Sequence, residues 1–346
     1  MELTDNLNIV EFKPLITPEQ LKEKYPLSDE VAHLIAQSRK TIQSILQNED
    51  KRRIIITGPC SLHDKKAALD YANRLKKLQD IVQDKLLIIM RAYFEKPRTT
   101  LGWKGMLYDP YLDGSDNIQE GFNIARDLLL EIGKIGLPCA TEFLDPIVPQ
   151  YIADLISWAA IGARTAESQI HRQMASGLSM PIGFKNSTDG NLSSAVGAVK
   201  SAASPHSFLG ISQDGQVIIA ETSGNKFCHI VMRGGTNEPN YTAEYVAFAT
   251  MLLKKAGISN GVIIDCSHAN SNKDYRLQRN ALIDVAMQVK SGTNFICGVM
   301  LESFLAEGNQ KPDKPEKLIY GKSITDGCIN WQETEELINI FAASVR

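Results

Sequence analysis

The sequence predicts an α/β protein, a (β/α)8 TIM barrel with an N-terminal helical extension and an inserted β-hairpin. Eight short and almost wholly apolar runs recur along the 346 residues, as expected of strands buried on both faces. Segments with helical periodicity separate most of these runs, and alternating strands and helices call for a parallel sheet. We therefore expect a catalytic barrel over residues 51–346, preceded by an extension over residues 1–50 that makes oligomer or regulatory contacts.

The first strand is expected at residues 54–56, because Gly58 and Pro59 end its hydrogen-bond ladder and place Cys60 just beyond it. Asp64 can cap the helix that follows. The other seven runs each lead into an ionisable or chelating side chain: residues 86–90 into Arg91, 138–141 into Glu142, 158–163 into Arg164, 180–184 into Lys185, 229–232 into Arg233, 262–265 into His268, and 295–301 into Glu302. Helical periodicity is clear at residues 118–135, 192–203, 243–256 and 275–289. A closed barrel would gather the ends of its strands at one mouth.

Two segments lie outside an ideal barrel. Residues 17–20 form a capping-box start with proline at the first helical position, and residues 28–46 carry an apolar helical stripe. This extension could plug the bottom of the barrel or pack against another subunit, and the sequence leaves both alternatives open. Residues 207–222 alternate around Asp214-Gly215, which predicts the inserted hairpin.

Two long loops are expected at the mouth. Residues 93–114 are dense in glycine, proline and basic residues, and a loop of this length in a compact domain usually has a function. We interpret it as a loop that covers substrate. The loop at residues 307–325 delivers Asp326 ahead of a closing helix at about residues 331–343.

Composition excludes several classes of protein. The net charge is −3, and no run of lysine and arginine with interleaved aromatics indicates nucleic-acid binding. The apolar runs are far shorter than the ~20 residues that span a bilayer. The first residues have neither a basic region nor an apolar core of a signal peptide, so we expect a cytoplasmic protein with free cysteines.

Cys60, His268, Glu302 and Asp326 come from four strand-end loops that a barrel would bring together. One thiolate, one imidazole and two carboxylates make a ligand set that suits Mn²⁺, Fe²⁺, Co²⁺, Cu²⁺ or Zn²⁺ without choosing among them. The other five histidines are interpreted as surface or packing residues.

Arg91, Arg164, Lys185 and Arg233 each follow an apolar strand, where a charge must be paired or hold an anion. Ion pairs with Glu142 or Glu167 are the structural alternative. The four cations exceed those partners, and arginine binds phosphate and carboxylate bidentately.

A second basic cluster, at residues 96–99, lies on the long loop. The two clusters predict a pair of anionic substrates, at least one of them phosphorylated. Beside a metal, either attack of an enol carbon on a carbonyl or activation of water remains open, with Glu142 or a group near the metal carrying protons.

At these residues the sequence resembles the class I 3-deoxy-D-arabino-heptulosonate 7-phosphate (DAHP) synthases, over about residues 17–331. The resemblance is carried by long strings: GPCSLHD from Gly58, YFEKPRTTLGWKG from Tyr93, SWAAIGARTAESQIHR from Ser157, GLSMPIGFKN from Gly177, HIVMRGG from His229, DCSHANSNKD from Asp265 and YGKSITDGCINW from Tyr320. The chain departs from the family pattern at Ser187, where glycine is usual.

The resemblance implies condensation of phosphoenolpyruvate with erythrose 4-phosphate and water to DAHP and phosphate, the first step of the shikimate pathway. It implies one divalent metal per subunit, with Mn²⁺ favoured and Fe²⁺, Co²⁺ or Zn²⁺ as alternatives, which would polarise the aldehyde. The implied ligands are Cys60, His268, Glu302 and Asp326.

The same resemblance assigns the substrate contacts. Arg91 and Lys185 would hold the phosphoenolpyruvate carboxylate, and Lys96 would lie near the bridging oxygen. Glu142 would position the water that attacks C2. The remaining implied contacts are Ala163, Arg164 and Arg233 to the phosphoenolpyruvate phosphate, and Arg98 and Thr99 to the phosphate of erythrose 4-phosphate. Lys96, Glu142, His268 and Asp326 are the implied catalytic residues.

Family members are commonly inhibited by an aromatic amino acid, which implies an effector site here. The matching positions are Pro149, Gln150, Ser179, Phe208, Gly210 and Ala220, with Asp5 and Asn6 from a neighbour's N-terminal tail. In related enzymes serine at the place of Gly210 goes with phenylalanine and glycine with tyrosine, since the missing hydroxymethyl leaves room for a phenol oxygen. We therefore expect tyrosine as effector, in a homodimer or homotetramer.

Two other functions are compatible with a barrel of this kind. The related synthase of 3-deoxy-D-manno-octulosonate 8-phosphate shares phosphoenolpyruvate chemistry, but the basic loop, the N-terminal extension and the hairpin argue against it. A non-catalytic amino-acid sensor on the same scaffold would have lost metal ligands or cations, and none is lost here.

Overall fold

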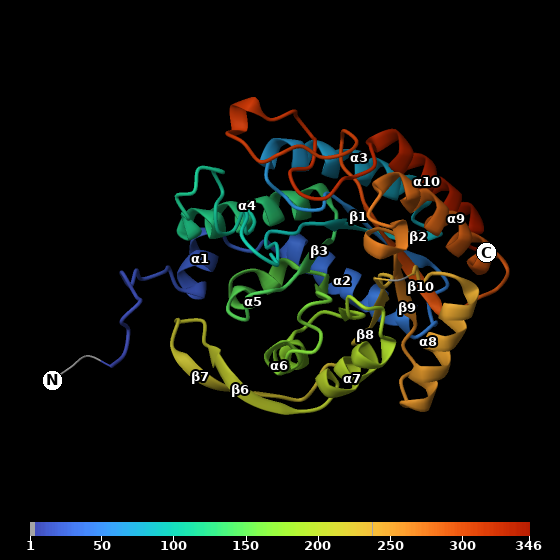
Figure 1. The fold of residues 1–346 in the computed structure, drawn as a ribbon, viewed down its shortest axis with the longest axis horizontal. Coiled ribbons are helices and arrows are strands. Elements are labelled where there is room, and N and C mark those ends of the chain that lie inside the picture. The colour runs from blue at the N-terminus through green and yellow to red at the C-terminus, as the bar shows by residue number, and fades with distance from the viewer. Residues whose placement is uncertain (1–3, 237) are drawn as a thin grey trace.

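The computed structural model describes residues 4–236 and 238–346, so that the first three residues of the expected extension lie outside the description. Eight parallel strands close into a barrel in the order β1-β10-β9-β8-β5-β4-β3-β2, with helices around it (Figure 1). The predicted fold class is confirmed. The barrel strands are β1 (Arg53–Gly58), β2 (Leu86–Arg91), β3 (Cys139–Glu142), β4 (Trp158–Ile161), β5 (Ile182–Lys185), β8 (His229–Met232), β9 (Val262–Asp265) and β10 (Ile296–Glu302).

Strand β1 closes the barrel by pairing on both sides. Ile55 is in register with Ile88 of β2 and with Val299 of β10, and all six residues of β1 are buried. This burial on both faces explains why the run is apolar throughout and does not alternate. The predicted strand at residues 158–163 ends earlier, at Ile161, because the next two residues already belong to the wall of the cavity at the mouth.

Helices cover the outside of the barrel. They are α3 (Lys65–Val82), α4 (Ile118–Ile135), α5 (Val148–Ile152), α6 (Gln169–Gly177), α7 (Leu192–Ala202), α8 (Ala243–Lys255), α9 (Gln278–Lys290) and α10 (Trp331–Ser344). Asp64 caps α3 as predicted, because its Oδ1 accepts the Ala67 N–H at 3.0 Å. The helix predicted from residue 275 begins with a 3₁₀ turn, Tyr275–Leu277, before α9.

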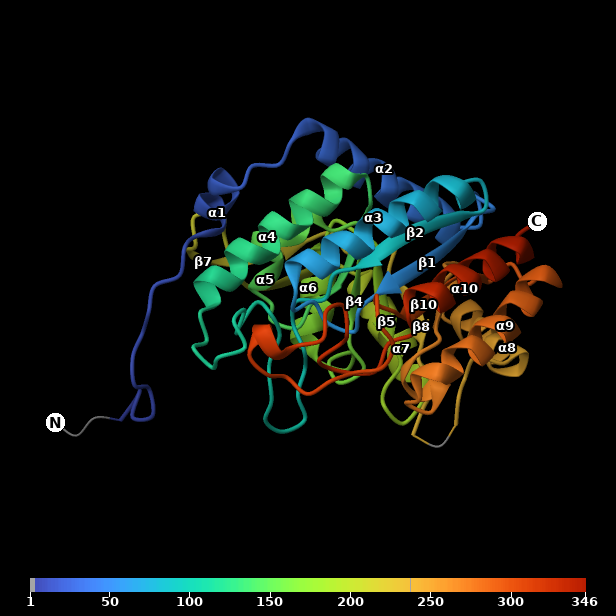
Figure 2. The ribbon, with the colours of Figure 1, turned by 90° about the horizontal axis from the view of Figure 1, so that it is seen from above.

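The N-terminal extension contains α1 (Pro18–Lys24) and α2 (Asp29–Leu46). Thr17 and Gln20 form the predicted capping box of α1. The last turns of α2 bury Ile42, Ile45 and Leu46 in one apolar cluster with barrel residues that include Trp158. Figure 2 shows α2 on the opposite side of the barrel from the long loops after β2 and β10. Within one chain, α2 therefore plugs the bottom of the barrel.

The inserted hairpin consists of β6 (His206–Ile211) and β7 (Val217–Thr222), paired antiparallel beside α6. Gly215 adopts φ +81° in the turn, which explains the glycine after Asp214. Gln213 at the tip bonds to α1 and α5, since its carbonyl accepts the Glu19 N–H at 2.8 Å and its amide donates to Gln150 Oε1 at 2.6 Å.

The tail ahead of α1 extends away from the barrel (Figures 1 and 2) and exposes several large apolar side chains: Leu7, Ile9, Val10 and Phe12. None of the helices in the described part of the chain has the length and apolar character needed to cross a membrane.

Candidate active site

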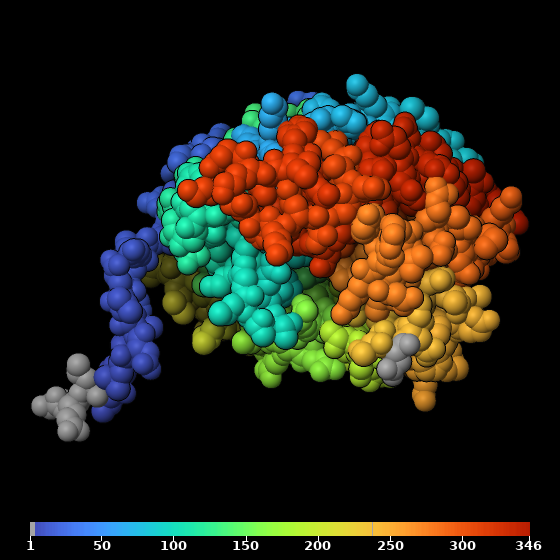
Figure 3. Space-filling model, turned by 45° about the horizontal axis from the view of Figure 1, so that its top comes forward, coloured from blue at the N-terminus to red at the C-terminus, as the bar shows by residue number. Residues whose placement is uncertain are grey.

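The carboxyl ends of the barrel strands surround a pocket of about 590 Å³. The surface is hollowed between the loop after β2 and the segments after β9 and β10 (Figure 3). Arg91, Glu142, Lys185 and Glu302 are the last residues of their strands, so the backbone ladder itself aims them at the mouth. The predicted residues that line the pocket are Arg91, Lys96, Arg98, Glu142, Ala163, Arg164, Lys185, Arg233, His268, Glu302 and Asp326.

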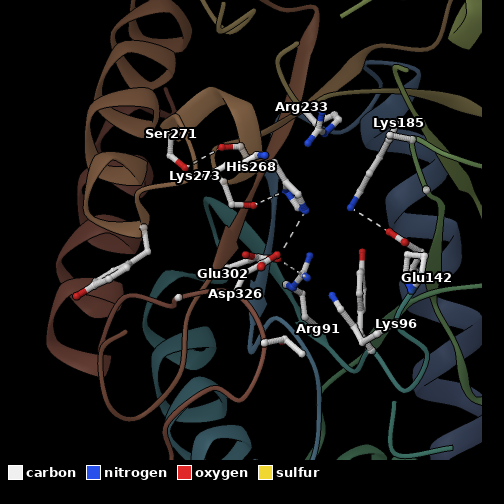
Figure 4. Close-up of a pocket in the computed structure, with 18 of the residues that line it drawn as sticks. Arg91, Lys96, Glu142, Lys185, Arg233, His268, Ser271, Lys273, Glu302 and Asp326 are labelled. Atoms are coloured by element: carbon white, nitrogen blue, oxygen red, sulfur yellow. Dashed lines mark hydrogen bonds and ion pairs between the residues drawn. The ribbon is translucent and has the colours of Figure 1, made fainter. Parts of the chain in front are cut away.

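Three of the four predicted metal ligands form a compact cluster. The Cys60 Sγ and one oxygen each of Glu302 and Asp326 all lie within 4.8 Å of one another. His268 stands beside this cluster, with its Nε2 3.8 Å from Glu302 Oε1 (Figure 4). The structure thus brings Glu302, Asp326 and His268 to the wall of the pocket and leaves Cys60 buried beside them, so it does not line the pocket itself.

The charges of this cluster fit a divalent cation. Burial, together with the neighbouring Glu302, raises the pKa of the Cys60 thiol to about 11. Burial would also raise the pKa of Asp326, but Lys96, His268 and the Cys60 hydrogen bond together outweigh burial and lower that pKa. The buried Glu302 and the exposed Asp326 beside a buried thiol form an anionic set, in which a thiolate needs a cation for compensation.

Two of the predicted cations are already paired with carboxylates. Lys185 Nζ lies 3.0 Å from Glu142 Oε2, and Arg91 Nη2 lies 3.2 Å from Glu302 Oε1. The ion-pair alternative therefore holds in part. Arg91 also lies over the Tyr93 ring, with its guanidinium carbon 3.9 Å from the ring centroid.

Other cations at the mouth have no acidic partner. Among the residues that the structure describes, Lys96, Arg98, Arg164 and Arg233 form no ion pair. Lys96 Nζ instead lies 3.1 Å from Cys60 Sγ. Unpaired cations that share a pocket with paired ones are what an anionic ligand requires.

The loop that carries Lys96 and Arg98 is held by its own backbone and by Glu95. Lys96 N–H donates to Lys104 O at 2.8 Å, and Arg98 Nε donates to Trp103 O at 2.7 Å. The buried Glu95 carboxylate accepts the backbone N–H groups of Leu144 and Asp145 at 3.2 and 3.0 Å. Arg98 and Thr99 are both exposed, but only Arg98 lines the pocket.

Three of the predicted effector positions, Phe208, Gly210 and Ala220, lie on one face of the hairpin. Phe208 pairs in register with Ala220, and both are half-buried, as is Gly210. Gln150 is linked to the hairpin through Gln213. The other positions are the buried Pro149, the exposed Ser179 after α6, and the exposed Asp5 and Asn6 in the tail.

Sequence reasoning missed polar residues behind the pocket wall. Asp265, fully buried at the end of β9, and Ser267, which lines the pocket, are not among the predicted site residues. Tyr93, Lys273 and Tyr275 also line the pocket. Asp265 could have been found from the sequence, because it is a carboxylate at the end of an apolar strand, as Glu142 is.

The chain matches a known protein family over most of its length, since residues 24–339 match the DAHP synthetase I family. The chain belongs to the DAHP synthetase I family. Its resemblance to the class I DAHP synthases is confirmed.

Relatives of three regulatory types resemble this DAHP synthase equally well. It is 51% identical to the Escherichia coli K12 phospho-2-dehydro-3-deoxyheptonate aldolases named Phe-sensitive, over 99% of this chain and 97% of the relative, and Tyr-sensitive, over 96% and 94%. It is 51% identical to the Trp-sensitive enzyme of Enterobacter agglomerans, over 100% and 99%. The structure of the aldolase from Francisella tularensis SCHU S4 matches with a TM-score of 0.96 at 49% identity, covering 98% of both chains.

Proposed function

We propose that this DAHP synthase is metal-dependent and condenses phosphoenolpyruvate with erythrose 4-phosphate and water. The observation that carries the proposal is a pocket lined by Glu302, Asp326 and unpaired cations, with the buried Cys60 clustered behind those two carboxylates. The products are DAHP and inorganic phosphate.

Cys60, Glu302, Asp326 and His268 would hold the divalent metal, with Mn²⁺ favoured. When bound, the metal polarises the aldehyde of erythrose 4-phosphate toward attack by C3 of phosphoenolpyruvate. Burial of Cys60 and Glu302 keeps water from competing for these donors.

The cations divide between the two ends of phosphoenolpyruvate. Arg91 is paired with Glu302 and Lys185 with Glu142 at the pocket wall. Each cation can also bind the substrate carboxylate while it keeps this contact. Arg164 and Arg233, with the Ala163 amide, are placed for the phosphate, since neither arginine has an acidic partner among the described residues.

Glu142 is suited to orient the attacking water. Burial would raise its pKa, but Lys185 and Lys96 outweigh burial and lower it, so the carboxylate stays charged and accepts a hydrogen bond from water. Water adds to C2 as the new carbon–carbon bond forms, and the resulting phosphohemiketal releases phosphate by cleavage of its C–O bond. Lys96 would stand by the bridging oxygen, and Arg98 with Thr99 would hold the second phosphate.

The test is phosphoenolpyruvate consumption by chelator-stripped protein. We expect turnover that requires both erythrose 4-phosphate and restored Mn²⁺, and none when arabinose 5-phosphate replaces erythrose 4-phosphate. Turnover by protein verified to be metal-free would contradict the metal site. Turnover with arabinose 5-phosphate alone would contradict the substrate assignment.

We also propose tyrosine as the feedback effector, bound at the hairpin. Gly210 lies beside Phe208 and Ala220, where a Cβ would first meet atoms at 3.8 and 3.9 Å, so the site has free space for a phenol oxygen. Inhibition curves for tyrosine, phenylalanine and tryptophan test this proposal. Tyrosine should inhibit at the lowest concentration, and equal curves for tyrosine and phenylalanine would refute it.

A further inference from the structure

Asp265 is a buried carboxylate that the mechanism above does not use. It ends β9, none of its surface is exposed, and it does not line the pocket. Its Oδ1 accepts the Ser267 N–H at 3.1 Å and the Ser267 Oγ–H at 2.6 Å. Its Oδ2 accepts no well-directed hydrogen bond within the described part of the chain.

Two nitrogens of predicted site residues face that second oxygen from different elements. His268 Nδ1 lies 3.0 Å away and Lys185 Nζ lies 3.7 Å away. A fully buried carboxylate charge is costly unless hydrogen bonds and nearby positive groups compensate it.

The network around His268 selects one form of its ring. Ser267 Oγ donates its proton to Asp265 and lies 2.7 Å from His268 Nδ1, so its free lone pair accepts from an Nδ1–H. Both acceptors, Ser267 Oγ and Asp265 Oδ2, lie on the Nδ1 side. In the neutral ring, Nε2 then keeps its lone pair, and Nε2 is the nitrogen that faces Glu302.

The backbone around His268 is also restrained. His268 adopts φ +57°, in the left-handed region that side chains rarely occupy. The Lys273 N–H donates to His268 O at 2.7 Å and closes the segment into a tight turn. A strained backbone held by local bonds is common where a side chain must point in one direction.

We propose that Asp265 is a positioning residue that couples the metal site to the phosphoenolpyruvate site. Its hydrogen bond to Ser267 Oγ and the charge of its Oδ2, 3.0 Å from Nδ1, orient His268 so that Nε2 is presented to the metal. The same oxygen, 3.7 Å from Lys185 Nζ, restrains that ammonium beside Glu142. This inference rests on the proposed metal-dependent function. A carboxylate behind a metal-binding histidine typically strengthens metal binding 10–100-fold by fixing the tautomer and orientation of the ring, about the effect expected here.

The first test replaces Asp265 with asparagine. Asp265→Asn keeps the volume, but its amide can donate to Nδ1 and favour the wrong tautomer. We expect the Mn²⁺ dissociation constant, measured from the free Mn²⁺ signal by electron paramagnetic resonance, to rise about 10–100-fold. The KM for phosphoenolpyruvate should rise and the KM for erythrose 4-phosphate should stay unchanged.

Asp154→Asn is the matched control, because Asp154 pairs with the buried Arg126 at 2.8 Å and does not line the pocket. It should leave the Mn²⁺ dissociation constant unchanged. Equal weakening in both variants, or an Asp265→Asn constant within twofold of the parent, would overturn the positioning role while leaving the metal site intact. A parent protein that binds no Mn²⁺, Fe²⁺, Co²⁺ or Zn²⁺ would overturn the proposed metal site as well.

A second test needs no folded Asp265 variant. Long-range proton–nitrogen correlation spectra of the metal-free parent report which nitrogen of each neutral imidazole carries the proton. The His268 signals are assigned by their loss in His268→Gln. We expect a proton on Nδ1, and a neutral ring protonated on Nε2 would overturn the proposal.

Discussion

Lys185 Nζ and Glu142 Oε2 lie 3.0 Å apart at the ends of β5 and β3, and each shifts the pKa of the other. Burial alone would lower the pKa of Lys185 and raise that of Glu142, yet the pair reverses both shifts, so both groups stay charged. The pair therefore presents an ammonium and a carboxylate to substrate without prior proton exchange.

Glu142→Gln tests the role of that carboxylate. Removing the charge leaves Lys185 without its nearest partner and leaves water unoriented, so kcat should fall by about 10²–10⁴-fold. The Mn²⁺ affinity should be unchanged, since Glu142 lies outside the ligand cluster. Steady-state kinetics with Glu30→Gln, an exposed position on α2, as control measure this effect. A kcat within threefold of the parent would remove Glu142 from the chemistry.

Glu95 makes stability depend on pH. Burial raises its pKa to about 8, so the folded protein keeps a proton that the unfolded chain releases near its ordinary pKa of about 4.3. The stability that this group contributes is fully present below about pH 4.3 and is lost as pH rises through about 8.

Glu95→Gln should remove this dependence. The unfolding free energy of the parent minus that of the variant should fall by up to ~1.4 kcal/mol per pH unit between about pH 5 and pH 8, and level off above it. Urea denaturation across this range measures the difference, with Glu49→Gln as an exposed control. A difference that is flat with pH would show that Glu95 titrates normally.

At the scale of elements, α2 covers the bottom of the barrel with its apolar side chains. Ile42, on its buried face, has none of its surface exposed. Ile42→Ala should reduce the unfolding free energy by about 2–5 kcal/mol, because it removes buried apolar atoms and leaves a cavity that α2 cannot move to fill. Activity per folded molecule should persist, since the mouth lies at the other end.

Ile81→Ala on α3 is the matched control, because 71% of the Ile81 side chain is exposed. Denaturant titration of both variants should show a change within about 0.5 kcal/mol for this one. Equal losses in the two variants would mean that α2 is not part of the core.

The hairpin is the second element with a role of its own. A Cβ at Gly210 meets no atom closer than 3.8 Å, so Gly210→Ser should fold normally. Its hydroxymethyl occupies the space proposed for the phenol oxygen, so sensitivity should shift from tyrosine toward phenylalanine. Inhibition curves against Ser207→Ala, on the opposite face of β6, measure the shift, and unchanged selectivity would place the effector elsewhere.

At the scale of the whole molecule, the hairpin and tail expose apolar surface. Leu209 and Ile219 are register partners on the outer face of the hairpin, exposed by 78% and 71%. With the apolar tail, this surface supports the proposed homodimer or homotetramer. The tail carries Asp5 and Asn6, which fits an effector site completed by a neighbour.

Leu209→Lys with Ile219→Lys should therefore lower the assembly mass and weaken effector inhibition while leaving catalytic turnover in place. Sedimentation velocity measures the mass, with Ile81→Lys as the exposed control on α3. A parent protein that sediments as a monomer would contradict this prediction.

The sequence by itself determined the local parts of this protein. Runs buried on both faces read as strands, a 3.6-residue period read as helices, and a charge at the end of each apolar run located Arg91, Glu142, Lys185 and Glu302 at the mouth. These features depend on neighbours along the chain, which is why pattern alone reveals them.

Contacts between distant segments were decided by the tertiary structure. Only closure of the barrel sets Asp265 against both His268 and Lys185, pairs Arg91 with Glu302, and turns α2 into a plug. Each of these contacts joins elements whose distance depends on the barrel's strand order and register, and no periodicity within one segment records that distance.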